Sequence, residues 1–334
     1  MKPFFIALAA AAALFSAGCA PVVKEAPPRV SAPPANYDTS HYPVTIENMD
    51  SYGKVREETF SRPPERVVAV WQNSIETLIA LGVGDRIVGA MGLPDGKYLR
   101  PEYREAYSRI PYTSMESLDV ETVMMQDPDL IVGWKSTFDK KVLRSTEFWN
   151  SRNVATYIAP GSASTIKYHT IEYEYDDILN LGKIFDRQDQ AKKLVAQMEG
   201  EIQEAEDKAA AMGRHPRGLI IEYQGENIAV YGERSLAGDI LKRMGGELLA
   251  ADQDSISKEQ IRELSPDAIF MVVIESDYGQ EEQILDLVRK DKVLRELPCV
   301  KAGKVFVLPL YTIYSSGVRT YDGIQIIGRG LYGD

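Results

Sequence analysis

The stretch Ser117-Leu-Asp-Val-Glu121-Thr-Val123, followed by Pro128-Asp129-Leu-Ile131, decides the fold because the chain contains it twice. The second copy is Ser255-Ile-Ser-Lys-Glu259-Gln-Ile261, followed by Pro266-Asp267-Ala-Ile269. Every matched position is offset by 138 residues, the difference between 121 and 259. Each copy joins a helical pattern to a short apolar run that is typical of a buried parallel strand. A single repeat with so long a period predicts two related α/β lobes and not a solenoid.

A long helix is predicted between the two copies. Over Gln188–Ala211 the apolar residues recur at three- and four-residue spacing, which is typical of one stripe on an amphipathic helix. About 24 residues at 1.5 Å each give roughly 36 Å, which is long enough to pass from one lobe to the other. Two α/β lobes that face each other leave a cleft between them, where ligand sites commonly form.

The N-terminal segment predicts export and a lipid anchor. A basic start is followed by the apolar run Phe4–Phe15 and by Ser16-Ala-Gly-Cys19, which resembles a bacterial lipobox. We expect acylation (palmitate) on Cys19, with an ordinary signal peptide and an incidental cysteine as the alternative. Six of the 18 prolines lie in residues 20–43, which predicts an extended tether. The predicted divisions are a signal peptide (1–18), a lipid-anchored tether (19–43), an N-terminal lobe (44–170), a helical linker (171–212) and a C-terminal lobe (213–334).

Composition narrows the function classes. The formal net charge is -11, with 38 Lys and Arg against 49 Asp and Glu, whereas a nucleic-acid-binding protein needs a basic face. Two cysteines exclude a disulfide framework, and Cys299 is predicted to be a small core residue. His169 and His215 are the only histidines of the predicted lobes, so a metal site built on several histidines is not expected. The chain has no G-x-S-x-G elbow, P-loop or H-E-x-x-H motif, which argues against an enzyme.

Five segments carry a family resemblance: Pro64-Glu-Arg-Val-Val-Ala-Val70, Glu76–Gly89, Asp127-Pro-Asp-Leu-Ile-Val-Gly133, Ser257-Lys-Glu-Gln-Ile261 and Ala302-Gly-Lys-Val-Phe-Val-Leu-Pro309. In this order they resemble the substrate-binding lipoproteins of ABC importers for ferric siderophores, haem and cobalamin, the class III periplasmic binding proteins. The resemblance covers the predicted lobes and implies two Rossmann-like α/β lobes joined by one rigid helix, with little hinge closure. It also implies a monomer that delivers its ligand to a permease dimer with a cytoplasmic ATPase.

Glu121 and Glu259 occupy matching positions in the two copies. Each is predicted in the first turn of a helix, where the helix dipole favours a carboxylate, so an ordinary surface role is one interpretation. Ser257 and Gln260 have the spacing of a capping box, which supports this placement. The resemblance implies a second interpretation, in which one glutamate of each lobe docks onto arginines of the permease.

The candidate ligand-binding residues follow the predicted strands, because ligands of open α/β sheets lie beyond the carboxyl ends of the strands. Aromatic residues recur at these ends, and three cations add positive charge that we expect to gather in the cleft. Aromatic faces and cations suit a large, flat ligand with negative charge. The candidates are Trp71, Gln72, Lys97, Tyr98, Trp134, Lys135, Tyr223, Tyr231, Tyr311, Tyr314 and Arg319.

These inferences predict the substrate-binding component of an ABC importer, held by Cys19 at a membrane of the cell envelope with its body outside the cytoplasm. The three cations favour a ferric siderophore, either a catecholate or a hydroxamate, as the ligand. Haem, which would need an axial Tyr or His, and cobalamin, which would use mainly aromatic stacking, stay open. A surface lipoprotein that senses its ligand without transporting it is a further alternative. No cofactor and no metal site are predicted.

Overall fold

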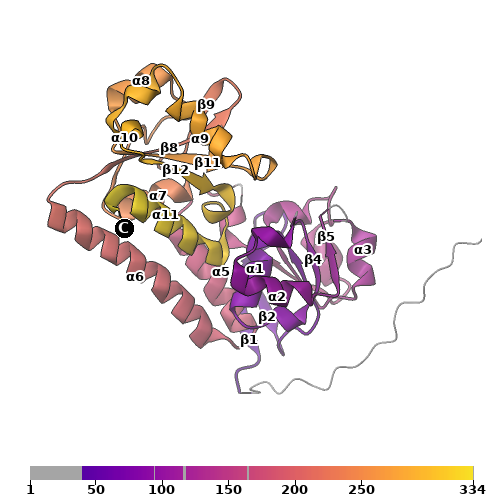
Figure 1. The fold of residues 1–334 in the computed structure, drawn as a ribbon. Coiled ribbons are helices and arrows are strands. Elements are labelled where there is room, and N and C mark those ends of the chain that lie inside the picture. Colours follow the sequence, from indigo (N-terminus) through magenta and orange to yellow (C-terminus); the bar gives the residue numbers. More distant parts are fainter. Residues whose placement is uncertain (1–39, 94, 116–117, 164, 334) are drawn as a thin grey trace, which may run out of the picture. The chain divides into compact units, whose positions relative to one another are not determined.

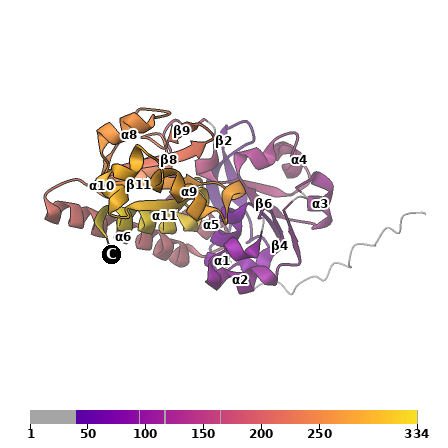
Figure 2. The ribbon, with the colours of Figure 1, turned by 45° about the horizontal axis from the view of Figure 1, so that its top comes forward.

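Each half of the chain forms a largely parallel β-sheet (Figure 1, Figure 2). The structure is a computed structural model, and it describes residues 40–93, 95–115, 118–163 and 165–333. The first sheet has the order β5-β4-β3-β6-β7, with every pair parallel. Two of its three inner strands, β3 and β6, are buried throughout, as expected for strands covered on both faces. The strands are β3 (Val67–Val70), β4 (Ile87–Met91), β5 (Tyr112–Ser114), β6 (Leu130–Gly133) and β7 (Ala155–Ile158).

The second sheet shares the strand order of four strands of the first, β4-β3-β6-β7. Its order is β10-β8-β11-β12 with parallel pairing, and β9 pairs antiparallel with β8. In both sheets the strand that follows the repeated helix, β6 or β11, pairs with an inner strand that comes much earlier in the chain. The strands are β8 (Arg217–Gln224), β9 (Asn227–Val230), β10 (Glu247–Leu248), β11 (Ala268–Val273) and β12 (Val305–Pro309).

The two repeated helices are built in the same way. Asp119 and Ser257 cap their N-termini, and each side chain accepts a hydrogen bond from an N–H of the first turn. Each helix is followed by a non-glycine residue with positive φ, 47° at Asp127 and 46° at Ser265. Both pairs are 138 residues apart, so the internal repeat read from the sequence is also a structural repeat. The helices are α3 (Val120–Met125) and α8 (Lys258–Leu264).

One long helix, α6 (Gln188–Met212), connects the two halves, as the sequence predicts. It packs against α5 (Ile171–Ile184), which precedes it, and against α11 (Thr320–Tyr332) at the end of the chain (Figure 1). A single buried apolar cluster includes residues of both sheets and of these three helices. The predicted α/β fold with parallel sheets and one long connecting helix is therefore confirmed.

Shorter helices cover the sheets, and the first of them ends at a glycine. The N–H of Gly82 donates to the Ile79 carbonyl at 2.9 Å, and the N–H of Val83 donates to the Leu78 carbonyl at 3.0 Å. Gly82 has a φ of 77°, so these bonds form a Schellman motif. The helices are α1 (Gln72–Ala80), α2 (Pro101–Ser108), α4 (Thr146–Asn150), α7 (Leu236–Arg243), α9 (Glu281–Arg289) and α10 (Pro298–Lys301).

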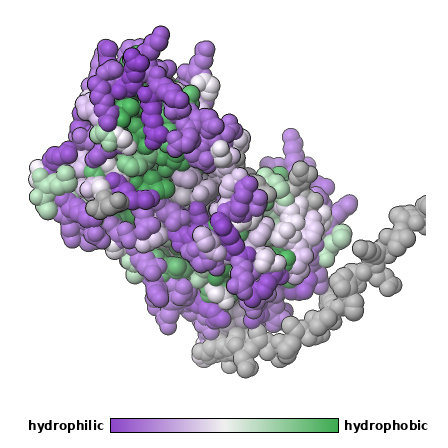
Figure 3. Space-filling view, in the orientation of Figure 1, coloured by the Kyte–Doolittle hydropathy of each residue, from purple (hydrophilic) through white to green (hydrophobic). Residues whose placement is uncertain are grey.

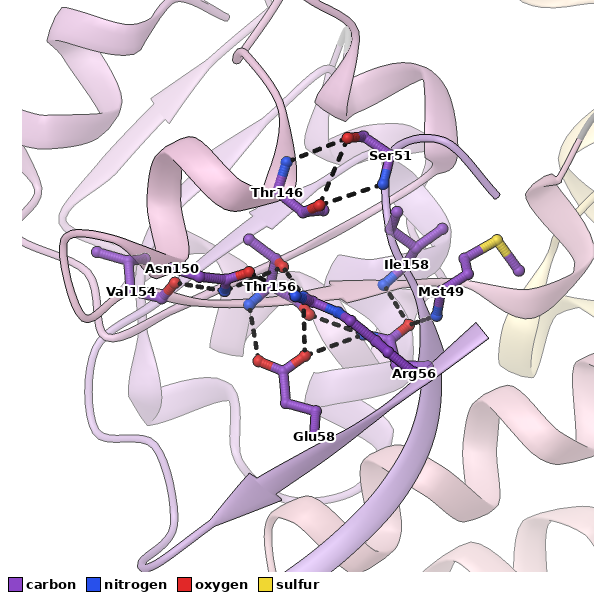
Figure 4. Close-up of polar contacts among 10 residues, drawn as sticks. Met49, Ser51, Arg56, Glu58, Thr146, Asn150, Val154, Thr156 and Ile158 are labelled. Atoms are coloured by element: carbon purple, nitrogen blue, oxygen red, sulfur yellow. Dashed lines mark hydrogen bonds and ion pairs between the residues drawn. The ribbon is translucent and has the colours of Figure 1, made fainter. Parts of the chain in front are cut away.

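An antiparallel hairpin is fastened to the edge of the first sheet. The Asn48 side chain donates to the Thr156 carbonyl at 2.7 Å and accepts from the Ile158 N–H at 3.2 Å. Figure 4 shows Arg56 reaching across to Asn150, with a guanidinium nitrogen 2.8 Å from the amide oxygen. The hairpin thus becomes part of the first lobe. Its strands are β1 (Val44–Met49) and β2 (Val55–Phe60).

Among the described residues, no helix has the length and apolar character that a membrane crossing requires. Hydrophilic side chains cover most of the face drawn in Figure 3. Cys299 is 3% exposed, which confirms its predicted place in the core. The predicted signal peptide, Cys19 and the tether as far as residue 39 lie outside the described residues.

Candidate ligand-binding site

Two adjoining cavities lie beyond carboxyl ends of the strands, where the sequence predicts a ligand. The smaller, here called the aromatic cavity, encloses about 30 Å³, and the larger, here called the polar cavity, about 300 Å³. Both are lined from the two halves of the chain, and they share Tyr314 and Ser315. Other lining residues are Trp71, Gln72, Asn73, Trp134 and Tyr311 in the aromatic cavity, and His169, Glu174, Tyr231, Arg234, Asp252 and Asp254 in the polar cavity.

Two indole rings form one wall of the aromatic cavity. Trp71 follows β3 and Trp134 follows the neighbouring strand β6, so the rings stack with centroids 5.4 Å apart. Tyr314 meets Trp134 edge-on at 5.5 Å. Trp71 has a φ of 73°, which is rare for a bulky residue, and such strain clusters at functional sites. Gly92 makes room for this indole, because a Cβ there would lie 2.6 Å from the ring.

Three tyrosines extend the aromatic surface. The ring centroids of Tyr98 and Tyr278 are 4.9 Å apart, and those of Tyr278 and Tyr311 are 5.5 Å apart. The Gln72 side chain donates to the Tyr98 carbonyl at 3.1 Å, which links this group to the start of α1. Sequence reasoning missed Tyr278, although its place shortly after β11 was the same signal that selected the other residues.

The polar cavity combines aromatic rings with ionisable groups. The rings of His169 and Tyr314 are 6.1 Å apart, and burial lowers the pKa of His169 below its usual value. The Tyr231 hydroxyl donates to Glu222 at 2.7 Å. Arg234 lies 3.8 Å from Asp254. Among the described residues, no group of three or more His, Cys, Asp and Glu side chains could hold a metal ion.

Glu174 is a buried carboxyl group in the wall of the polar cavity that sequence reasoning missed. Its carboxyl accepts a hydrogen bond from the Gly317 N–H at 2.7 Å, which ties α5 to the segment that follows β12. Burial, reinforced by the neighbouring Asp177, raises the pKa of Glu174 to about 8. Burial likewise raises the pKa of Asp177 to about 7. The two carboxyl groups therefore hold protons more strongly than ordinary surface carboxyls do.

The three predicted cations do not line these two cavities. The Arg319 side chain is 8% exposed, and its guanidinium forms ion pairs with Glu76 at 3.3 Å and Asp322 at 2.8 Å. Lys97 is 64% exposed and lies 3.4 Å from Asp95. Arg319 also stacks on the Tyr311 ring at 4.6 Å, so it reaches the ligand region indirectly.

Lys135 and Tyr223 also point elsewhere. The Lys135 side chain lies near the hairpin turn, where a Cβ on Gly53 would be 3.8 Å from its Cε. Tyr223 packs against the second apolar cluster, and burial raises the pKa of its hydroxyl to about 12. The structure thus gathers Trp71, Gln72, Trp134, Tyr231, Tyr311 and Tyr314 at the two cavities, with Tyr98 beside them.

The two repeated glutamates are exposed and lie in the first turns of their helices, Glu121 in α3 and Glu259 in α8. The predicted capping box is present, because Ser257 and Gln260 exchange side-chain to backbone hydrogen bonds of 2.9 and 3.2 Å. The local helix placement is therefore correct, and both carboxylates are open to a partner.

Comparison with known proteins identifies relatives over most of the chain. The family model described as "Periplasmic binding protein" matches residues 67–312. A solved periplasmic binding protein from Veillonella parvula is 42% identical, with a TM-score of 0.84, and the match covers 88% of this chain and 92% of that one. The petrobactin-binding protein YclQ of Bacillus subtilis is 28% identical over 87% of this chain and 88% of its own length. The haem uptake protein IsdE of Staphylococcus aureus is 29% identical over 39% of this chain and 46% of its own.

Proposed function

Because the chain belongs to the family of periplasmic binding proteins, we propose that it captures a ferric siderophore outside the cytoplasm and delivers it to the permease of an ABC importer. The observation that carries the proposal is the pair of adjoining cavities, whose walls come from both halves of the chain. Stacked indoles and tyrosines offer a broad apolar surface with polar edges, which suits a large complex with aromatic or chelated groups. The relative YclQ of Bacillus subtilis is a petrobactin-binding protein, and this similarity supports the proposed ligand class.

The delivery step would use the exposed glutamates of the two lobes. Glu121 and Glu259 stand in the first turns of equivalent helices, so a permease dimer with one basic site per subunit could contact both. We further propose that Cys19 carries a lipid anchor and that the residues after it tether the body to the membrane. A protein that only senses its ligand would not depend on Glu121 and Glu259 for contact with a permease.

Tryptophan fluorescence tests the ligand assignment. The chain has three tryptophans, and Trp149 is 1% exposed in the core of the first lobe, whereas Trp71 and Trp134 line the aromatic cavity. We expect a ferric siderophore to quench the emission of the wild type strongly. The variant W71F/W134F, in which Trp149 alone emits, should lose most of the quenching.

Haem and a cobalamin are titrated in parallel as competing ligands. A saturable response to haem or cobalamin, with none to ferric siderophores, would replace the siderophore assignment with that ligand. Quenching that is undiminished in W71F/W134F would place the ligand away from the aromatic cavity.

A further inference from the structure

The walls of both cavities lack uncompensated positive charge. Within the described part of the chain, Arg234 is the only Lys or Arg that lines either cavity, and its guanidinium lies 3.8 Å from the Asp254 carboxylate. Burial lowers the pKa of His169, so its imidazole is neutral at neutral pH. Arg319, which reaches the site through Tyr311, is engaged by two carboxylates of its own. Arg234, His169 and Arg319 are therefore each already paired or neutral.

Negative groups remain at the same walls. Asp252 lines the polar cavity, and no basic side chain of the described residues forms an ion pair with it. Glu222 lies behind Tyr231. Its carboxyl group accepts a hydrogen bond from the tyrosine hydroxyl at 2.7 Å, and the residue is 8% exposed. The net charge of the cavity walls is therefore negative.

The unpaired polar groups of the site are neutral. Ser315, which lines both cavities, and Asn73, which lines the aromatic cavity, are each 4% exposed. The Ser315 hydroxyl and both polar atoms of the Asn73 amide have no hydrogen-bond partner among the described residues. Buried polar groups are normally paired, so these are positions at which a ligand would supply the missing hydrogen bonds. A hydroxyl and an amide match carbonyl, N–O and N–H groups.

We propose that the ligand is a ferric complex without net negative charge, of the tris-hydroxamate type, and that the two cavities discriminate against the tris-catecholate type. This inference rests on the proposed function. Three hydroxamates contribute one negative charge each and balance the ferric ion, whereas three catecholates contribute two each and leave a trianion. A trianion would meet carboxylates and no free cation at these walls, and like charges at short range oppose binding. Neutral hydroxamate and amide oxygens would instead bond to Ser315 and Asn73.

The experiment compares three ferric complexes of similar size and different charge. Ferrichrome is a neutral tris-hydroxamate, ferrioxamine B carries one additional ammonium group, and ferric enterobactin is a tris-catecholate trianion. Each is titrated into the full folded body at neutral pH, and the dissociation constant is measured by tryptophan quenching. We expect at least one hydroxamate complex to bind at least about tenfold more tightly than ferric enterobactin.

The outcomes separate the two proposals. Equal or tighter binding of ferric enterobactin would overturn the charge inference and leave the siderophore function standing. Failure of all three complexes to bind would overturn both.

A pair of variants tests the source of the discrimination. In D252N the unpaired carboxylate is removed, so the preference for ferrioxamine B over ferric enterobactin should fall by about two- to fivefold, the effect of one exposed charge. The matched control is D207N, because Asp207 is exposed on α6 and lies outside both cavities. An unchanged preference in D252N, or an equal change in D207N, would contradict the assignment of charge selection to the cavity wall.

Discussion

The side-chain hydroxyl of Thr137 accepts a hydrogen bond from the indole N–H of Trp71 at 3.0 Å. The backbone N–H of Trp134 donates to the same oxygen at 3.1 Å, so one buried hydroxyl orients the two residues that form the indole wall. Gly133 leaves the space for it, because a Cβ there would lie 2.7 Å from the Thr137 oxygen. The geometry of the indole pair therefore depends on a residue that does not line the aromatic cavity itself.

The substitution T137V keeps the shape of this side chain and removes the acceptor. Two N–H groups would lose their partner, so we expect the free energy of unfolding to fall by about 1–3 kcal/mol. Ligand affinity should fall as well, because the Trp71 indole loses its fixed orientation. Urea unfolding and the quenching titration measure the two effects. T137S retains the hydroxyl and should keep most of the affinity; a T137V protein with wild-type affinity would contradict the positioning role.

Gly92 supports the same indole from the opposite direction, and Gly82 provides a matched control. The two glycines have φ values of 78° and 77°, so alanine at either position costs about 1–2 kcal/mol in backbone strain. Only at Gly92 would the new Cβ meet the Trp71 ring, since a Cβ on Gly82 has no described neighbour within 4 Å. We expect G92A to weaken ligand binding and G82A to leave it unchanged. Similar affinities for the two variants would mean that the ring position is unimportant.

The raised pKa values of Glu174 and Asp177 predict that the free energy of unfolding falls as pH rises. Their folded-state pKa values are about 8 and 7, above ordinary values of 4.5 and 3.8. Between the ordinary and the raised pKa the folded state binds more protons than the unfolded state, so the free energy of unfolding decreases with pH. The decrease begins near pH 4 to 5, ends near pH 8 and amounts to a few kcal/mol.

Urea unfolding of wild type and E174Q/D177N across this range measures the effect. The double variant cannot ionise at these positions, and its stability should change less between pH 5 and pH 8. Parallel pH profiles for the two proteins would show that the buried carboxyls do not carry the effect.

Substitution of Arg319 distinguishes two roles of this side chain. The sequence predicts a ligand contact, whereas the structure shows an ion pair with the buried Glu76. Glu76 is fully buried and depends on this guanidinium at 3.3 Å, so R319M should lower the free energy of unfolding by about 3–5 kcal/mol. The double variant E76Q/R319M removes the orphaned charge and should recover a substantial part of the loss. If Arg319 contacts the ligand directly, R319M loses affinity while its stability stays near that of the wild type. Urea unfolding together with the quenching titration distinguishes the two.

The strands and the repeat could be predicted because their signals are local. The apolar run that forms β6 and the cap at Ser257 are each encoded within a few consecutive residues. The structure brings several residues that follow the strand ends together for the same reason, since β3 and β6 are neighbours and place Trp71 beside Trp134.

The partners of the charged residues could not be predicted, because they come from distant parts of the chain. Arg319 and Glu76 are 243 positions apart, and Glu174 meets Gly317 across 143 positions. Positive charge beyond a strand end therefore predicts a ligand contact for Arg319, whereas its guanidinium pairs with the carboxylates of Glu76 and Asp322. Lys135 has the expected position in the chain, but its side chain lies towards the hairpin turn, and no local pattern sets that direction.

Charge reversal of the two exposed glutamates, Glu121 and Glu259, is predicted to cause a loss of transport without a loss of ligand binding. Under the proposed docking role, charge reversal in E121K/E259K would place lysines opposite basic sites of the permease, and such like-charge contacts cost several kcal/mol. We expect uptake of the iron complex to fall at least about tenfold while the dissociation constant of the ligand stays unchanged. Uptake by cells with the full chain, its permease and its ATPase measures the effect. Normal uptake by the double variant would rule out the docking role of Glu121 and Glu259.

The two helices that carry these glutamates, α3 and α8, differ in one respect that sharpens this prediction. Met124 and Met125 of α3 are 40% and 75% exposed, whereas Arg262 and Glu263 stand at the equivalent positions of α8. Exposed apolar side chains beside a docking carboxylate favour a partially apolar contact on the N-terminal lobe. M124S/M125S should therefore reduce uptake without altering ligand affinity. The matched control is M212S, a methionine that is 45% exposed at the end of α6. Equal uptake by the two variants would mean that the apolar pair makes no contact with the permease.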